Sequence, residues 1–230
     1  MLILACDTSN STCCAGLYDG GKELEYEISF ENRTHSETFM PLVERVLDKG
    51  GKAYSDLDAL AVTTGPGSFT GIRIGVSAVK GMSLALQIPC IPVSATQALA
   101  ASVETESSLP EETIIVPCFD ARNSRVFGSV VAHDNLDVLV QEDAYSNVNL
   151  AAELLEIPDI KNKKIYVIGN GAEVMREVLE PMNIKAEYAP GAVILPRGIA
   201  ACALKSKQLI SGAEISPSYC AVSSAERLRK

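Results

Sequence analysis

The stretch that most constrains the fold of this chain is residues 63–75, which read TTGPGSFTGIRIG. An apolar run at 57–62 precedes it and predicts a buried strand. The triplet Gly65-Pro66-Gly67 ends that strand, because two glycines around a proline favour a tight turn. The hydroxyl side chains that follow can cap a helix, which we expect over 71–86. A strand, a glycine turn and a helix N-terminus together suit an anion, since backbone donors and the positive end of the helix dipole converge there.

The helix expected over 71–86 is unusual because one of its faces is built from small residues. At 100° per residue, that face carries Gly71, Gly75, Ala78, Met82 and Ala85, with Ile74 and Gly81 beside it. Each glycine inside a helix costs roughly 1 kcal/mol relative to alanine, so three of them indicate a close approach to the backbone. Two neighbours fit this pattern: another helix of the same domain, or a helix of a second protein chain. The stretch lacks both the lysine of a GxxxxGK[ST] phosphate loop and the flanking glycines of a GxSxG esterase turn.

The charge and the cysteines of the chain limit its chemistry. Its 230 residues carry a net charge of −9, so it is a poor candidate to hold RNA or DNA unaided, whereas a basic partner protein is compatible with it. The seven cysteines include no CxxC pair, and only two histidines are available to join them. We therefore expect no metal site and no cofactor. The chain has no recognisable signal peptide and no apolar run of membrane-spanning length, which predicts a protein of the reducing cytoplasm, without a membrane partner.

The first half of the chain predicts three strands, a helix, a strand and a helix. Residues 2–6 predict a central strand, and two further strands flank the hairpin turn Asp19-Gly20-Gly21 before a helix over 35–49. Asp7 follows the first strand in a turn rich in hydroxyl groups. Its carboxylate can either hold a hydrated metal ion, with the hydroxyls facing a phosphate, or satisfy N–H groups of the turn. For His35, at the start of the helix, a capping or solvent-exposed role is favoured over a ligand role.

The second half repeats this order. Three strands and a helix precede a strand that enters the glycine turn Gly169-Asn170-Gly171 and another helix. The repetition predicts an α/β protein with two lobes built from duplicated mixed-sheet domains, as in actin-like ATPases. The stretch at 104–112, which is acidic and contains a proline, predicts an N-terminal lobe at 1–106 and a C-terminal lobe at 107–230. The last helix and the tail are candidates to pack back on the first lobe.

Seven motifs stand in a characteristic order along the chain. They are Asp7-Thr8-Ser9, His35-Ser36-Glu37, the glycine-rich stretch from Gly65 to Gly75, Lys80-Gly81, Asp120-Ala121-Arg122, Gly169-Asn170-Gly171 and Pro217-Ser218-Tyr219. Over nearly the whole chain, this series resembles the TsaB family, also called YeaZ, of bacterial tRNA threonylcarbamoyladenosine biosynthesis. The glycine-rich stretch is the specific part of the resemblance, and the other motifs are weak singly.

The resemblance implies a two-lobed actin-like ATPase-type (ASKHA) fold and a non-catalytic scaffold subunit. Such a subunit binds the threonylcarbamoyltransferase TsaD, with the ATPase TsaE, for N6-threonylcarbamoylation of adenosine 37 in tRNAs that read codons beginning with A. It reaches tRNA only through the complex, and it forms a homodimer through the same face when TsaD is absent.

The resemblance also implies two sets of site residues and no catalytic residue. Helices 35–49 and 71–86 would form the partner interface, with His35, Phe39, Leu42, Val43, Val46, Gly71, Ile74, Gly75, Ala78 and Met82. A degenerate nucleotide site would contain Asp7, Thr8, Ser9, Asp120, Gly169 and Gly171. The tail departs from the family, because Cys220-Ala221 stands where Leu-Arg is usual. If that arginine contacts a partner in the family, only Arg227 and Arg229 remain in this tail to replace the contact.

Two enzymatic alternatives compete with the scaffold. An active nucleotide-dependent kinase or ATPase of the same fold would require turnover that depends on Asp7. A peptidase ranks last, because the sequence has no Ser/His/Asp spacing and no zinc pair that supports one.

Overall fold

A computed structural model of the chain describes residues 1–30, 34–103, 110, 112–206 and 208–220. Contacts group the described residues into two compact units: those within Met1–Ser102 and Ile194–Ser218, and those within Val103–Val193 together with Tyr219 and Cys220. The last helix and most of the described tail thus pack with the first unit. The expected boundary at 106 and the basic residues Arg227 and Arg229 lie outside the described residues.

The first unit is built on a five-stranded mixed sheet. Its strands are β1 (Leu2–Asp7), β2 (Cys13–Asp19), β3 (Lys22–Ser29), β4 (Ala59–Gly65) and β5 (Cys90–Ser94), in the order β3-β2-β1-β4-β5. The three N-terminal strands pair antiparallel, and β1, β4 and β5 pair parallel. The hairpin between β2 and β3 turns on Gly20 and Gly21, which have φ values of +55° and +89°. These left-handed values favour glycine and explain its use at this turn.

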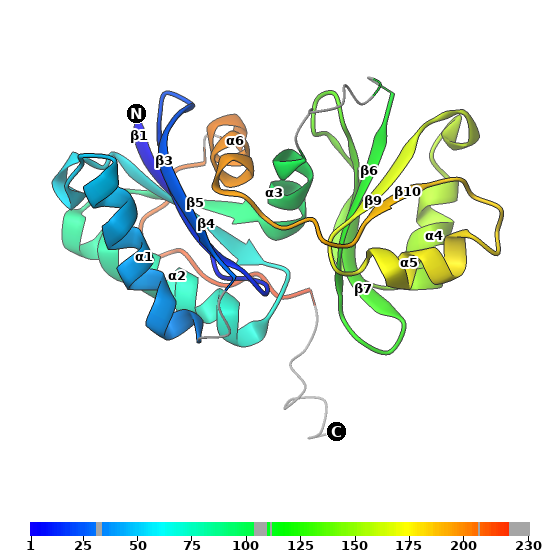
Figure 1. Cartoon of the computed structure of the whole chain (residues 1–230), viewed down its shortest axis with the longest axis horizontal. Coiled ribbons are helices and arrows are strands. Elements are labelled where there is room, and N and C mark those ends of the chain that lie inside the picture. The colour runs from blue at the N-terminus through cyan, green and yellow to red at the C-terminus, as the bar shows by residue number, and fades with distance from the viewer. Residues whose placement is uncertain (31–33, 104–109, 111, 207, 221–230) are drawn as a thin grey trace. The chain divides into compact units, whose positions relative to one another are not determined.

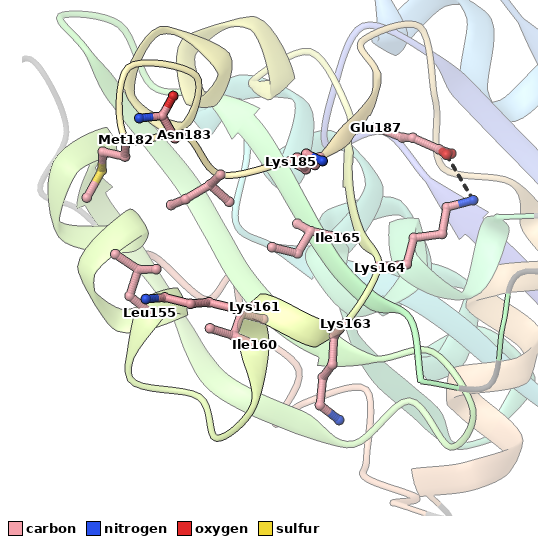
Figure 2. A pocket seen from close by; sticks show the side chains of 12 residues that line it. Leu155, Ile160, Lys161, Lys163, Lys164, Ile165, Met182, Asn183, Lys185 and Glu187 are labelled. Atoms are coloured by element: carbon pink, nitrogen blue, oxygen red, sulfur yellow. Dashed lines mark ion pairs between the residues drawn. The ribbon is translucent and has the colours of Figure 1, made fainter.

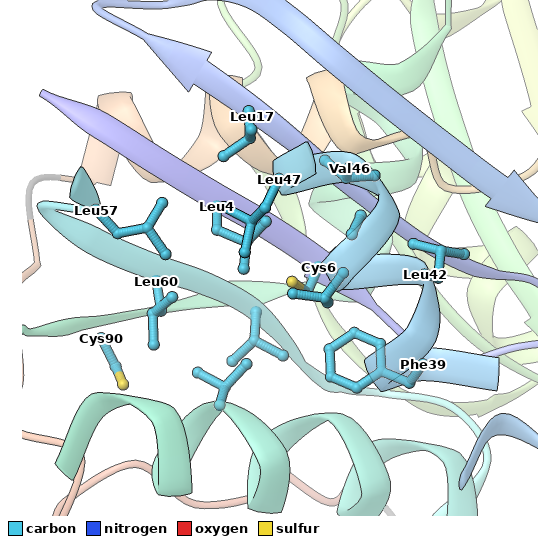
Figure 3. Packing of buried hydrophobic residues seen from close by; sticks show 14 of the residues in the cluster. Leu4, Cys6, Leu17, Phe39, Leu42, Val46, Leu47, Leu57, Leu60 and Cys90 are labelled. Atoms are coloured by element: carbon cyan, nitrogen blue, oxygen red, sulfur yellow. The ribbon is translucent and has the colours of Figure 1, made fainter. Parts of the chain in front are cut away.

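Helices cover both faces of this sheet (Figure 1). On one face lie α1 (His35–Lys49) and α2 (Phe69–Leu86), with the short 3-10 helix η1 (Tyr54–Asp56) after α1; on the other lie α3 (Ala95–Ser102) and α6 (Pro196–Ser206). Strands β1 and β4 are buried along their whole length, as expected for central strands covered on both sides. A core of hydrophobic side chains, largely from β1, β4, α1 and α2, fills the space beneath the two N-terminal helices (Figure 3).

The second unit repeats this plan. Its strands are β6 (Ile114–Asp120), β7 (Arg125–Ala132), β8 (Val138–Ser146), β9 (Ile165–Ile168) and β10 (Glu187–Ala189), in the order β10-β9-β6-β7-β8. Its helices are α4 (Asn147–Leu155), the 3-10 helix η2 (Ile160–Asn162) and α5 (Ala172–Leu179). Three antiparallel strands are again followed by parallel pairing of the first strand with the fourth and of the fourth with the fifth. The predicted α/β fold with duplicated mixed sheets is confirmed.

No helix among the described residues combines the length and the apolar character that crossing a membrane requires.

Candidate functional site

The turn after β1 lies at the centre of the first candidate site. Asp7 is fully buried, and its Oδ1 accepts hydrogen bonds from the Ser9 N–H at 3.0 Å, from Ser9 Oγ at 2.5 Å and from Thr63 Oγ1 on β4. Its Oδ2 has no hydrogen-bond partner among the described residues. Burial raises the pKa of Asp7 above its usual value, against the opposing effects of the bonds from Ser9 and Thr63 and of the nearby His35.

The N-terminal half of α2 packs directly onto this turn. Thr8 Oγ1 donates a hydrogen bond to the Gly71 carbonyl oxygen at 2.7 Å, and the Ser68 N–H donates to the Ser9 carbonyl oxygen at 2.7 Å. A β-carbon built on Gly71 would overlap the Thr8 carbonyl oxygen, and one built on Gly75 would overlap Thr8 Oγ1. Gly71 and Gly75 therefore make their close approach to the turn after β1 in the same chain, and not to a neighbouring helix.

Because of this packing, the assignment of two residues to the partner interface must be corrected. Gly71 and Gly75 are both buried beneath Thr8, so neither is available to a second chain. The same packing engages the hydroxyls that a phosphate or a hydrated metal ion would need, since Thr8 and Ser9 both bond within the chain. Two roles were expected for Asp7: holding a hydrated metal ion, or satisfying N–H groups of its own turn. Its contact with the Ser9 N–H is of the second kind.

Four residues of α1 require the same correction. Phe39, Leu42, Val43 and Val46 are at most 1% exposed, and they belong to the core of the first unit. Figure 3 shows Phe39, Leu42 and Val46 on α1 above the strands of the sheet. These residues form the sheet-facing side of an amphipathic helix, so they cannot also be its partner-facing side. His35 is half-buried, and its Nε2 lies 2.6 Å from the Asn10 carbonyl oxygen.

The outward side of α2 is the part of the expected interface that stays accessible. We define the α2 outer face as Ile74, Ala78, Gly81, Met82 and Ala85, which are all half-buried or exposed. Ala78 and Met82 also pack in part against the core of the first unit, so they lie at the inner border of this face. Within this face Gly81 differs from the two buried glycines, because a β-carbon built on it meets nothing within 4 Å. Gly81 also has no left-handed backbone conformation. Nothing in the fold of the described chain therefore requires glycine at this position.

The tail segment is held against the same unit. The Ser218 N–H donates to the Thr64 carbonyl oxygen at 2.7 Å, and Lys80 Nζ donates to the Ala213 carbonyl oxygen at 2.9 Å. Ile210 exchanges two backbone hydrogen bonds with Cys90 at the edge strand β5. Lys80 and the Pro217 motif both stand out in the sequence, but Lys80 contacts Ala213 and Ser218 contacts Thr64, more than 130 residues away in each case, so local patterns indicate neither contact.

The second set of nucleotide-site residues lies in the second unit. Asp120 is exposed at the end of β6; its Oδ1 accepts the Arg122 N–H at 2.7 Å, and its own N–H donates to Asn170 Oδ1 at 3.0 Å. Gly169 has a φ of +92°, and a β-carbon built on Gly171 would lie about 3 Å from the backbone of β6. This glycine turn thus packs onto the end of β6 much as the start of α2 packs onto the end of β1.

The described residues offer little other chemistry. They contain no group of three or more His, Cys, Asp or Glu side chains placed to hold a metal ion. The cysteines are free; six are buried, and Cys220 is half-buried. Burial raises the pKa of Cys13 and of Cys202 to about 12, so both stay protonated thiols at neutral pH.

Known proteins resemble this chain in sequence and in structure. The family model of TsaD, tRNA N6-adenosine threonylcarbamoyltransferase, matches residues 29–228. A tRNA threonylcarbamoyladenosine biosynthesis protein TsaB of Bacillus subtilis is 33% identical over 180 residues, covering 78% of this chain and 76% of the relative. The TsaB of Haemophilus influenzae is 27% identical over 224 residues, covering 95% and 93%. The solved structure of YeaZ from Pseudomonas aeruginosa matches with a TM-score of 0.80 at 25% identity, covering 95% of this chain and 99% of that one.

Proposed function

Since the chain belongs to the TsaB family of tRNA threonylcarbamoyladenosine biosynthesis proteins, we propose that it serves this modification as a non-catalytic subunit that binds TsaD. TsaE joins the two proteins, and tRNA is reached through the complex. Membership in the TsaB family supports a role in threonylcarbamoyladenosine biosynthesis. The binding of TsaD, the addition of TsaE and the absence of catalysis by this chain are our proposal.

The observation that carries the proposal is Gly81. An exposed glycine in the middle of an 18-residue helix costs roughly 1 kcal/mol relative to alanine. The buried Gly71 and Gly75 recover that cost through contact with Thr8, whereas a β-carbon built on Gly81 would meet nothing within 4 Å, so packing within the described chain does not offset the cost there. A helix of a partner chain that lies across the α2 outer face would supply the missing neighbour, because small residues let two helices approach closely.

Three of the residues first assigned to the interface belong to this proposal unchanged. Ile74, Ala78 and Met82 are half-buried on the α2 outer face, which gives it apolar character beside Gly81. His35, at the start of the neighbouring helix α1, is also partly accessible. We propose that TsaD covers this surface, and that a second copy of the chain covers it when TsaD is absent.

The charge of the chain supports an indirect role toward tRNA. A net charge of −9 opposes the binding of a polyanion, so the phosphate contacts must come from the partners. The engaged hydroxyls of Thr8 and Ser9 likewise support a subunit that assembles a complex and does not itself catalyse the transfer.

The test is isothermal titration of the chain with TsaD of the same organism. Ala85→Glu places a charge on the α2 outer face and is expected to weaken binding at least tenfold. Ala152→Glu on α4 is the matched control, because Ala85 and Ala152 are both exposed helical alanines and Ala152 belongs to the second unit. Equal affinities for the two variants would show that TsaD does not use this face.

One observation favours the alternative of an active nucleotide-dependent enzyme. The unpaired Oδ2 of the buried Asp7 is the kind of group that often awaits a ligand. This alternative predicts ATP hydrolysis by the purified chain and its loss in Asp7→Asn. The scaffold proposal predicts no hydrolysis above background by either protein.

A further inference from the structure

The second unit contains a cavity that neither the partner interface nor the nucleotide site uses. It has a volume of about 780 Å³ and lies between the segment from Ile160 to Ile165 and the segment that precedes β10. Cavities of roughly 300–1,000 Å³ are the size that takes small organic ligands.

The floor of the cavity is aliphatic. Ile160 and Ile165 are buried, and the half-buried Leu155 and Ile184 pack against the core of the second unit. Figure 2 shows Leu155, Ile160 and Ile165 around a common opening. A polar ligand group on this floor would lose its bonds to water without replacement, so the buried part of a ligand must be apolar.

The rim of the cavity is basic in an otherwise acidic protein. Lys161, Lys163, Lys164 and Lys185 line it beside the single acidic residue Glu187. Lys164 Nζ pairs with Glu187 Oε1 at 3.0 Å, and Lys163 is half-buried (Figure 2).

Two lysines are therefore left to act on a ligand. Lys161 and Lys185 are exposed, and neither has an ion-pair partner within the part of the chain that the structure describes. In Figure 2 the Lys161 side chain runs beside Leu155, so its methylene stem adds to the apolar surface while its ammonium group stays at the rim.

We propose that this cavity binds an amphipathic anion: an aliphatic body that lies on the isoleucine and leucine floor, with a carboxylate or phosphate head at the rim, where it pairs with Lys161 or Lys185. The described lining residues include no aromatic ring, so a nucleotide base would find no stacking partner there. The inference is independent of the partner-binding role, because every residue involved lies in the second unit.

The test is isothermal titration calorimetry, in which the full chain is titrated separately with each of four small probes. Octanoate and octyl phosphate carry both required features and differ in the head group and by one carbon of the alkyl chain, so a difference in affinity well beyond fourfold identifies the preferred anion. Butyrate lacks most of the apolar body, and octyltrimethylammonium reverses the charge. Each buried methylene strengthens binding by roughly fourfold, so at least one octyl anion is expected to bind tenfold or more tighter than butyrate, and the cation not at all.

Charge-reversed variants locate the site. Lys161→Glu combined with Lys185→Glu is expected to weaken octyl-anion binding at least tenfold. The control combines Lys22→Glu with Lys52→Glu, which changes the net charge equally but lies in the first unit; it is expected to bind as the unaltered chain does. Circular dichroism verifies that both variants are folded. The proposal is overturned if neither octyl anion binds at millimolar concentration, if butyrate binds as well as octanoate, or if the two double variants bind alike.

Discussion

The two kinds of glycine in α2 lead to opposite predictions for the same substitution. Gly81→Ala adds a methyl group in open space on an exposed helix, so it should gain the helix propensity of alanine, about 1 kcal/mol of unfolding free energy. Gly75→Ala gains the same propensity but places its β-carbon against Thr8 Oγ1, the donor to the Gly71 carbonyl oxygen. Overpacking of about 1–3 kcal/mol and the loss of a bond worth about 1 kcal/mol outweigh the gain.

We expect Gly75→Ala to lower the free energy of unfolding by about 2 kcal/mol, and thus to differ from Gly81→Ala by about 3 kcal/mol. Urea unfolding followed by circular dichroism measures both variants beside the unaltered chain. In a thermal scan, the Gly81→Ala gain corresponds to a rise in Tm of about 2–4 °C for a chain of this length. The reasoning is refuted if Gly81→Ala destabilises the chain. It is also refuted if the unfolding free energies of Gly75→Ala and Gly81→Ala agree within about 0.5 kcal/mol.

Two further predictions concern the first unit. Phe39→Ala should lower the free energy of unfolding by about 3–5 kcal/mol, since Phe39 lies in the core; a cost below about 1 kcal/mol in urea unfolding would place it on the surface instead. For Asp7, burial raises the pKa in the folded state above its value in the unfolded state. The contribution of Asp7 to the stability of the fold is therefore most favourable below the unfolded-state pKa, and it declines as the pH rises toward and through the folded-state pKa. The stability of the unaltered chain relative to Asp7→Asn should therefore fall between pH 4 and pH 7 in urea unfolding; a difference that rises over this range would contradict the direction of the pKa shift.

Local patterns were enough to predict the architecture. The Gly65-Pro66-Gly67 turn, a cap by Ser68 or Thr70 and the order of strands and helices are all properties of short segments, and each half of the chain shows that order independently. Ser68 does cap α2, accepting a hydrogen bond from the Gly71 N–H at 3.3 Å. The strand β10 was not predicted, because three residues are too few to show a periodic pattern.

The interface was predicted only in part, for a physical reason. Helical periodicity shows that Phe39, Leu42 and Val46 share a face, but it does not say whether a sheet of the same chain or a partner covers that face. The glycines raise the same ambiguity: Gly71 and Gly81 look alike in sequence, and only the position of Thr8 separates them. The cavity near Lys161 and Lys185 brings together residues from two segments, so no single stretch of sequence indicates it.

The measurement that tests the central claim most directly is light scattering coupled to size-exclusion chromatography. The chain, TsaD of the same organism and their mixture are each analysed, and the mixture is repeated with Gly81→Leu in place of the unaltered chain. The account predicts a new species with the mass of one copy of each protein, and its loss with Gly81→Leu. Unchanged elution of the two separate proteins, or a complex that tolerates leucine at position 81, would contradict it.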